Sequence, residues 1–195
     1  MMAGYAFETS RMLLTTSDMS MTGAILDFQK RNRDHFLKWE DTKDPDYYTK
    51  DYQRYIIRTE KKELREGSGI VFYMLEKTSG LIIGRISVFG MMGGNCSFCM
   101  LGYKLDEKYQ HQGYMTEALA GVLDVLFEDL RMHRVEVYIL PVNAPSLALV
   151  RRLGFSEEGI AKGFMRIGGR WLDHVRFAML RDDWKTLREG TGHEE

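Results

Sequence analysis

The chain has 195 residues, of which 44% are hydrophobic and 28% are charged, and its formal net charge is −1 at pH 7. This composition is typical of an ordinary globular protein and argues against a strongly basic nucleic-acid binder, so no direct nucleic-acid contact is expected. The sequence shows neither a secretory signal nor a run of about 18 apolar residues, so we expect no membrane span and a cytoplasmic protein.

The first third of the chain is predicted to contain one strand and two helices. The strand covers residues 9–16, and a helical region follows over 18–35. An aromatic, acidic connection at 36–41 leads to a second and strongly polar helix at about 44–65.

The rest of the chain alternates strands and helices as a mixed α/β sheet does. Helices are expected at 113–130 and 146–153, and strands at 70–76, 81–89, 97–105, 134–140, 160–167 and 171–180. A strand that leads through a loop into a helix and on to a neighbouring strand is a parallel crossover. Two such strands can diverge and hold an elongated ligand. We expect one domain over residues 1–183 and a frayed C-terminal tail over 184–195.

Cys96 and Cys99 are the only cysteines, and their C-x-x-C spacing could suggest redox or zinc chemistry. They fall in a predicted strand, where residues three apart point to opposite faces, and no second ligand pair exists. We therefore expect small core or edge residues here and no metal site.

The most informative segment joins the strand ending near residue 105 to the helix that follows. Its sequence is Gln110-His111-Gln112-Gly113-Tyr114-Met115-Thr116. The polar loop and the first helical turn collect unpaired backbone N–H groups at the positive end of the helix dipole. Groups of this kind bind phosphate.

This segment resembles the pyrophosphate loop of the GNAT superfamily of acyl-CoA-dependent N-acyltransferases, whose pattern is Gln/Arg-x-x-Gly-x-Gly/Ala. Met115 departs from the pattern because it replaces the last small residue. A second motif, Asn143-Ala144-Pro145-Ser146 followed by Leu153-Gly154-Phe155, resembles the family's Asn-x-x-Ser…Leu-Gly-Phe helix. Two motifs in the right order are far more specific than either one alone.

Further segments resemble the bacterial ribosomal-protein-alanine N-acetyltransferases, which modify protein N-termini: Phe36-Leu37-Lys38-Trp39-Glu40, Leu101-Gly102-Tyr103 and Trp171-Leu172-Asp173-His174. The resemblance implies an α/β (α+β) fold, a single GNAT-type domain. Its mixed central sheet of about seven strands would be splayed at an acyl-CoA cleft and flanked by about four helices. It also implies that acetyl-CoA donates an acetyl group to a primary amine by direct attack in a ternary complex. The expected acceptor is the N-terminal α-amine of a protein, plausibly ribosomal.

The resemblance also assigns the cofactor contacts. Backbone groups of Tyr103, Lys104 and Leu105 would bind the pantetheine arm, and one N–H among them would polarise the thioester carbonyl. The remaining cofactor contacts would come from Gln110, His111, Gln112, Gly113, Tyr114, Met115, Thr116, Asn143 and Ser146.

Ser146 is the candidate proton donor to the leaving thiolate, because it matches the serine with this role in relatives. Asn143 would fix the start of its helix, although both residue types also cap helices routinely. Some relatives carry a glutamate base after the Leu-Gly-Phe helix, and Met165 stands there in this chain. A protein α-amine, with a pKa of about 7.7–8.0, is about a tenth neutral at pH 7, whereas a lysine amine near about 10.4 is neutral only to ~0.04%. The missing base therefore favours an α-amine acceptor.

The acceptor side is expected to include Phe36, Trp39, Glu40, Trp171 and His174. The two tryptophans would wall a peptide slot, and Asp173 would orient the His174 ring. Glu40, Glu136, His111 and His174 are candidates for relaying a proton or binding the incoming ammonium, although an ordinary structural role is more common for each.

Two other functions are compatible with the sequence. One is acetylation of a small amine such as a polyamine, an amino acid or an antibiotic, because the acidic loop at 40–44 could attract a polycation. The other is a non-catalytic acyl-CoA sensor, which the intact Gly113, Asn143 and Ser146 disfavour. The aromatic helix near residues 47–55 could form a dimer face or pack in the core, so a monomer and a homodimer both stay open.

Overall fold

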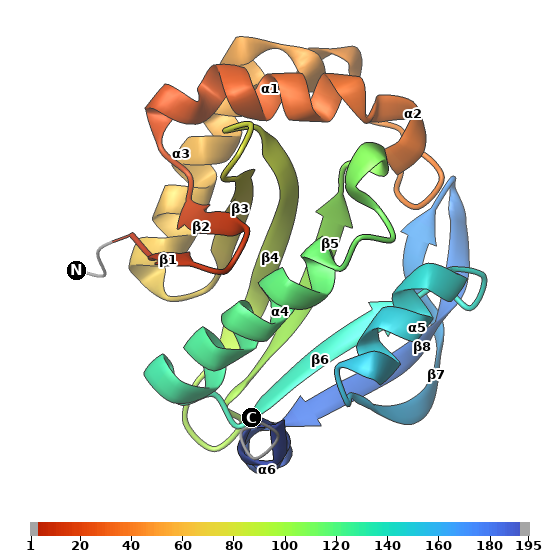
Figure 1. Cartoon of the computed structure of the whole chain (residues 1–195). Coiled ribbons are helices and arrows are strands. Elements are labelled where there is room, and N and C mark those ends of the chain that lie inside the picture. The colour runs from red at the N-terminus through yellow and green to blue at the C-terminus, as the bar shows by residue number, and fades with distance from the viewer. Residues whose placement is uncertain (1–3, 192–195) are drawn as a thin grey trace.

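A computed structural model describes residues 4–191, in which eight strands form one sheet (Figure 1). The strands are β1 (Ala6–Glu8), β2 (Met12–Thr16), β3 (Ile70–Glu76), β4 (Ile82–Met92), β5 (Phe98–Leu105), β6 (Arg134–Ile139), β7 (Ser156–Ile167) and β8 (Arg170–Leu180). Their order across the sheet is β1-β2-β3-β4-β5-β6-β8-β7, and only β5 and β6 run parallel. The mixed sheet is confirmed, with the short β1 as a strand that the sequence did not predict.

The helices are α1 (Thr22–Arg31), α2 (Arg33–Phe36), α3 (Lys50–Glu66), α4 (Tyr114–Asp124), α5 (Ala144–Arg152) and α6 (Arg181–Thr191). Short 3-10 turns precede α1, α3 and α4, and a π-helical turn, Val125–Asp129, extends α4. The second predicted helix begins later than expected, since the Thr49 hydroxyl caps it by accepting from the Tyr52 N–H at 3.3 Å. Among residues 4–191, no helix is long and apolar enough to cross a membrane.

The sheet separates two hydrophobic cores. Along β3, Phe72 and Met74 belong to the larger core, which α4 covers, whereas Val71 and Tyr73 belong to the smaller core beneath α1 and α3. Successive side chains of a strand point to opposite faces, so one strand serves both cores. Figure 1 shows α4 lying across the face of the sheet that is turned toward the viewer.

The predicted C-terminal tail is wrong for the residues that the structure describes. Residues 184–191 belong to α6, which begins at Arg181, while residues 192–195 lie outside the described part of the chain. Trp184 is only 4% exposed, and its Nε1–H donates to Asp124 Oδ1 on α4 at 2.9 Å. One aromatic side chain therefore anchors a helix whose polar sequence suggested a free end.

The parallel strands β5 and β6 separate before either of them ends. Their paired Cα positions run from Phe98–Arg134 to Leu101–Val137, and the pairing stops there. β4 remains paired with β5 as far as Leu105, so only the β5 edge that faces β6 is open. Backbone groups on such an edge can hydrogen-bond to an extended ligand that has amides of its own.

Candidate active site

A cleft of about 780 Å³ opens where β5 and β6 diverge. Its walls come from the end of α2, from β4 and β5, from the loop before α4 and from the start of α5. The sequence-predicted residues that line it are Phe36, Trp39, Glu40, Tyr103, Lys104, Leu105, Gln110, His111, Gly113, Tyr114, Met115, Thr116, Asn143 and Ser146. Residues from distant parts of the chain thus share one cavity.

The loop before α4 is anchored by a buried carboxylate, Asp106, which is 2% exposed. Asp106 Oδ2 accepts from Arg31 Nε at 2.6 Å and from Asn32 Nδ2 at 3.0 Å, and its Oδ1 accepts from the Lys108 N–H at 3.1 Å. Burial by itself raises the pKa of Asp106, but the hydrogen bonds from Asn32 and Arg31 outweigh it and lower that pKa. The ionised carboxylate therefore ties the loop to α1.

The loop presents backbone donors without internal acceptors. Within residues 4–191, no group accepts a hydrogen bond from the backbone N–H of His111, Gln112 or Gly113. His111 has φ +60° and Gly113 has φ +80°, a left-handed conformation that glycine adopts without a steric cost. Three free N–H groups at a helix N-terminus are the kind of donors that bind an anion.

Arg11, in the β1–β2 turn, holds this loop from outside the cleft. Its Nη1 donates to the Gln112 carbonyl at 2.8 Å, its Nε donates to Glu117 Oε2 at 2.7 Å, and its guanidinium lies 4.1 Å above the Tyr114 ring. In a trans peptide the carbonyl and the next N–H point in opposite directions. The bond to the Gln112 carbonyl therefore turns the Gly113 N–H away from Arg11, and Gly113 lines the cleft.

Asn143 and Ser146 begin α5 on the other side of the cleft. Asn143 Oδ1 accepts from the Ser146 N–H at 3.3 Å, so the capping function of Asn143 is present. The nearby Tyr103 hydroxyl is buried and makes no hydrogen bond in the described chain. Burial raises the pKa of Tyr103 to about 12, and the neighbouring Ser146 opposes that rise. Ser146 is thus next to a second hydroxyl that is neutral at physiological pH.

The opposite wall carries an ion pair between Glu40 and Lys104. Lys104 Nζ lies 3.1 Å from Glu40 Oε1 and 3.2 Å from Oε2, and it is 4.7 Å from the centre of the Phe36 ring. The Lys104 side chain is 18% exposed. Burial lowers the pKa of Lys104 to about 8, although the Glu40 carboxylate acts in the opposite direction.

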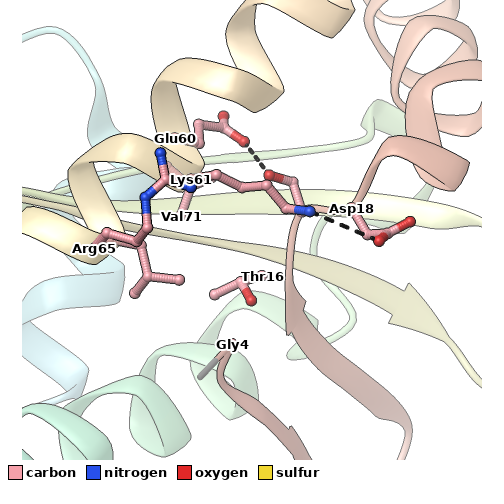
Figure 2. Close-up of a pocket in the computed structure, with 9 residues that line it drawn as sticks. Gly4, Thr16, Asp18, Glu60, Lys61, Arg65 and Val71 are labelled. Atoms are coloured by element: carbon pink, nitrogen blue, oxygen red, sulfur yellow. Dashed lines mark hydrogen bonds and ion pairs between the residues drawn. The ribbon is translucent and has the colours of Figure 1, made fainter. Parts of the chain in front are cut away.

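Arg85 lines the same cleft and is held by Glu60 of α3, which is 6% exposed. Glu60 Oε1 accepts from Arg85 Nη2 at 3.0 Å and from the Tyr73 hydroxyl at 3.1 Å. Glu60 also lines a smaller pocket of about 380 Å³ between the end of β2 and α3 (Figure 2). Its Oε2 accepts from the Ser17 hydroxyl at 2.7 Å. The buried carboxylate thus fixes a cation at the edge of the larger cleft.

The comparisons with known proteins agree with this geometry. Residues 4–156 match the model of the acetyltransferase (GNAT) domain. The chain is 34% identical over 158 residues to the probable N-acetyltransferase YjcK of Bacillus subtilis, which covers 81% of this chain and 87% of that protein. The chain belongs to the GNAT acetyltransferase family.

Two further relatives of this GNAT chain carry names that mention ribosomal proteins. The [ribosomal protein uS5]-alanine N-acetyltransferase of Escherichia coli is 31% identical over 192 residues, which covers 94% of this chain and 98% of that one. The crystal structure of the ribosomal-protein-S5-alanine acetyltransferase of Vibrio fischeri superposes with a TM-score of 0.87 at 27% identity, covering 92% of this chain and 98% of that one.

Mycobacterium smegmatis RimJ, in complex with a CoA disulfide, has a TM-score of 0.85 at 23% identity and covers 96% of this chain and 94% of its own. That likeness shows the shared fold. As a GNAT acetyltransferase, the present chain is an enzyme, and acetyl-CoA is its co-substrate.

Trp171 and His174 of this GNAT chain do not line the cleft. Trp171 is 68% exposed, whereas His174 is 3% exposed and packs with its ring centre 5.7 Å from that of Phe164. His174 Nδ1 lies 3.1 Å from the Leu172 carbonyl, and Asp173 instead accepts from the Gly163 N–H at 2.7 Å. The prediction that Asp173 orients His174 is wrong, because the bulged β7 backbone takes up that carboxylate.

Glu136 does not line the cleft either. Its Oε1 accepts from Arg134 Nε at 2.6 Å, and its Oε2 accepts from the Tyr138 hydroxyl at 2.6 Å. Alternation along β6 places Glu136 on the polar face of the strand, where neighbours on the same strand bind it.

Gln112 is also absent from the cleft lining, although its backbone carbonyl accepts from Arg11 and so holds the loop.

Only one of the two cysteines lies in the predicted strand. Cys99 belongs to β5 and is buried in the larger core, whereas Cys96 is exposed in the turn before β5, so the predicted strand position is wrong for Cys96. Burial raises the pKa of Cys99 to about 12, which keeps its thiol protonated.

Sequence reasoning missed Arg11 and Arg85, since their partners are far away along the chain and no local pattern indicated them.

Proposed function

We propose that this GNAT enzyme acetylates the N-terminal α-amine of a protein, with a ribosomal protein as the first candidate. The observation that carries the proposal is the 31% identity to a ribosomal-protein-alanine N-acetyltransferase over 94% of the chain. That span includes the segment Phe36–Glu40, of which Phe36, Trp39 and Glu40 line the cleft. A ribosomal acceptor would place the reaction in the cytoplasm.

Acetyl-CoA would lie between β5 and β6. The N–H groups of His111, Gln112 and Gly113 would bind its pyrophosphate, and the open edge of β5 would pair with the pantetheine arm. One backbone N–H of β5, from Tyr103, Lys104 or Leu105, would polarise the thioester carbonyl. The loop and the strand edge have the donors that these contacts need.

The chemical step is nucleophilic attack of a neutral amine on the thioester carbon. A C–N bond forms, the C–S bond breaks, and the leaving thiolate takes a proton from the Ser146 hydroxyl. Asn143 positions Ser146 by capping the first turn of α5. Met165 lies on β7 and is absent from the residues that line the cleft, so no side chain at that position takes the amine proton.

A small-amine substrate is less well supported by the charges in the cleft. Of the acidic loop at 40–44, Glu40 lines the cleft, and it already has Lys104 at 3.1 Å and Lys43 at 3.7 Å. The carboxylate of this loop that faces the cleft is therefore already paired with two lysines.

The test follows CoA release from acetyl-CoA with a panel of acceptors. The panel contains peptides with free Ala or Ser N-termini, the same peptides N-terminally blocked and carrying a lysine, a polyamine and an aminoglycoside. We expect turnover only with free N-termini, and mass spectrometry should place the added acetyl group on the α-amine. Turnover of blocked lysine peptides or of small amines alone would contradict the proposal.

A matched variant tests the proton donor. Ser146→Ala removes the hydroxyl but keeps the backbone N–H of residue 146, which donates a hydrogen bond to Asn143 Oδ1. The fold of α5 should therefore be kept. We expect kcat to fall by about 10²-fold or more, the usual contribution of a positioned acid, with little change in the KM for acetyl-CoA. An unchanged kcat would show that the Ser146 hydroxyl does not donate this proton.

A further inference from the structure

We propose that the Lys104 side chain accepts the proton that the acceptor amine loses when it attacks the thioester. This inference rests on the proposed function for the choice of acceptor. It supplies the proton acceptor that Met165 cannot provide.

The position of Lys104 on β5 is the first argument. Tyr103 and Lys104 are neighbours on this strand, so their side chains point to opposite faces of the sheet. Tyr103 packs with the larger core and lies near Ser146, whereas Lys104 contacts Phe36, which belongs to the smaller core. The proposed proton donor and the proposed proton acceptor thus flank the same stretch of strand, on the two sides from which thiolate and amine would approach.

The surroundings of the Lys104 ammonium provide the second argument. The groups that face it come from several elements: Glu40 and Lys43 from the connection after α2, Arg85 from β4 and Gln29 from α1. Gln29 Oε1 is 3.5 Å from Lys104 Nζ, and Glu40 is the single carboxylate in contact with it among the described residues. Arg85 Nη2 in turn donates to Glu60 Oε1, which holds the Arg85 guanidinium in place near Lys104.

These surroundings make a neutral lysine accessible near physiological pH. Burial comes first, Arg85 and Lys43 add to it, and together they exceed the opposing effect of Glu40, so that the pKa of Lys104 falls to about 8. At pH 8 about half of such a lysine is neutral, and its pKa matches the value of about 7.7–8.0 for a protein α-amine. A proton acceptor works best when its pKa lies near the operating pH.

The proposed step balances in protons and electrons. The amine nitrogen attacks the thioester carbon and becomes positively charged as the C–N bond forms. Its proton passes to the lone pair of neutral Lys104 Nζ, and the adduct collapses as the C–S bond breaks and the sulfur takes a proton from Ser146. The Lys104 ammonium is stabilised by Glu40 until it returns its proton to water, while Ser146 regains one from water.

The kinetic test compares Lys104→Met with Lys62→Met. Lys62 lies on α3, pairs with Glu66 at 3.8 Å, is not a cleft residue and is not among the charges that act on Lys104. We expect Lys104→Met to lower kcat by about 10²-fold with an unchanged KM for acetyl-CoA, and Lys62→Met to keep kcat within about twofold. Thermal melting of both variants checks that they are folded. A kcat for Lys104→Met within about threefold of the original would overturn the proposal.

The pH dependence separates the enzyme group from the substrate group. The profile of kcat is measured with an Ala-terminal peptide and with the same peptide beginning with trifluoroalanine, whose amine is much less basic. With the alanine peptide, the ionisation of the substrate amine contributes to the acid limb, whereas the amine of the trifluoroalanine peptide is already neutral in this pH range. If Lys104 takes the proton, an acid limb remains with the trifluoroalanine peptide and disappears in Lys104→Met. No acid limb with the trifluoroalanine peptide and the wild-type enzyme would contradict the proposal.

Glu40→Gln distinguishes the two partners of the ion pair. Since Glu40 raises the pKa of Lys104, its removal should move the acid limb to lower pH while the limb persists. If Glu40 itself accepted the proton, the limb would vanish in this variant.

A measurement without turnover keeps this inference separate from the proposed function. Trace labelling of the wild-type protein with acetic anhydride over pH 6–11, followed by mass spectrometry of the peptide that contains Lys104, gives the titration of this amine directly. A midpoint near pH 8 supports the proposal, and a midpoint near the ordinary value of about 10.4 overturns it. If only a polyamine or an aminoglycoside turns over, the proposed acceptor is wrong, and the Lys104 variants are then compared with that amine.

Discussion

Arg11 shows how one side chain can shape a cofactor site without lining it. Its guanidinium contacts Glu117, the Gln112 carbonyl and the Tyr114 ring, and its own N–H donates to Glu117 Oε1 at 2.9 Å. Burial by itself raises the pKa of Glu117, but hydrogen bonds from Thr9 and Arg11 outweigh it and lower that pKa. The β1–β2 turn and the start of α4 are thereby joined through an ionised pair at the back of the phosphate loop.

Arg11→Met should therefore weaken the binding of acetyl-CoA more than it slows the chemical step. Loss of charge-assisted hydrogen bonds worth about 1.5–3 kcal/mol should raise the KM for acetyl-CoA by about 10- to 100-fold, with little change in kcat. Initial rates measured with acetyl-CoA and with S-acetylpantetheine, which has no pyrophosphate, provide the check.

The donor without pyrophosphate should show almost no effect of Arg11→Met, because the phosphate loop does not bind it. Lys77→Met is the control, since Lys77 of the β3–β4 turn also contacts the β1–β2 turn, through the Thr9 carbonyl at 2.7 Å and Glu8 at 2.9 Å, and is not among the residues that line the cleft. An equal loss with both donors would mean that Arg11 supports the fold as a whole.

At the scale of elements, α6 closes one end of the larger core. Trp184 packs into that core together with Phe155 and Met179, and Asp124 of α4 receives hydrogen bonds from Trp184 and from Arg188. The helix is mostly polar, and the Trp184 indole is its side chain in the larger core. Packing of this kind is invisible in a sequence window where only one large apolar side chain stands out.

Trp184→Ala should lower the free energy of unfolding by about 3–5 kcal/mol, the usual cost of removing a buried aromatic side chain. Trp184→Phe keeps most of the apolar contact and loses the hydrogen bond to Asp124, so its cost should be about 1 kcal/mol. Urea denaturation followed by circular dichroism measures both. A cost below about 1 kcal/mol for the alanine variant would show that α6 is dispensable for stability.

At the scale of the whole molecule, one continuous sheet links the wall of the cleft that carries Glu40 and Lys104 to the loop before α4. The two cores share β3, and Glu60 ties α3 to β3 and β4 through Tyr73 and Arg85. A molecule built in this way is expected to unfold as one cooperative unit.

Tryptophan fluorescence can test this cooperativity, because the chain has only three tryptophans. The double variant Trp39→Phe/Trp171→Phe keeps Trp184, which reports on α6. The double variant Trp171→Phe/Trp184→Phe keeps Trp39, which reports on the wall of the cleft that carries Glu40 and Lys104. In each variant the fluorescence midpoint should coincide with the circular-dichroism midpoint. Acetyl-CoA at about 100 times its Kd should stabilise both variants by about 2.7 kcal/mol.

A transition at Trp184 that precedes the loss of secondary structure would contradict the single unit. The single unit would also be contradicted if acetyl-CoA raised the unfolding midpoint reported by one tryptophan but not the midpoint reported by the other.

The features that the sequence determined are local ones. Alternation and turn signals placed the strands from β3 to β8 within a few residues, because each strand needs its own pattern of apolar side chains to meet a core. The loop before α4 and the start of α5 were predicted from short motifs, since a glycine with positive φ and a capping asparagine act on the backbone beside them. The family resemblance predicted Tyr103, Lys104 and Leu105 beside the cofactor, and all three line the cleft.

The tertiary structure decided what depends on distant partners. The loss of pairing between β5 and β6 beyond Leu101 opens the cleft, and it results from the packing of whole strands. Packing also buried His174 away from the cleft, anchored α6 through Trp184, and brought Arg11 to Glu117 across 106 positions of sequence. The Lys104–Glu40 pair joins residues 64 positions apart. Local chemistry determines the elements, but only their packing sets the burial and the charges that tune a functional group.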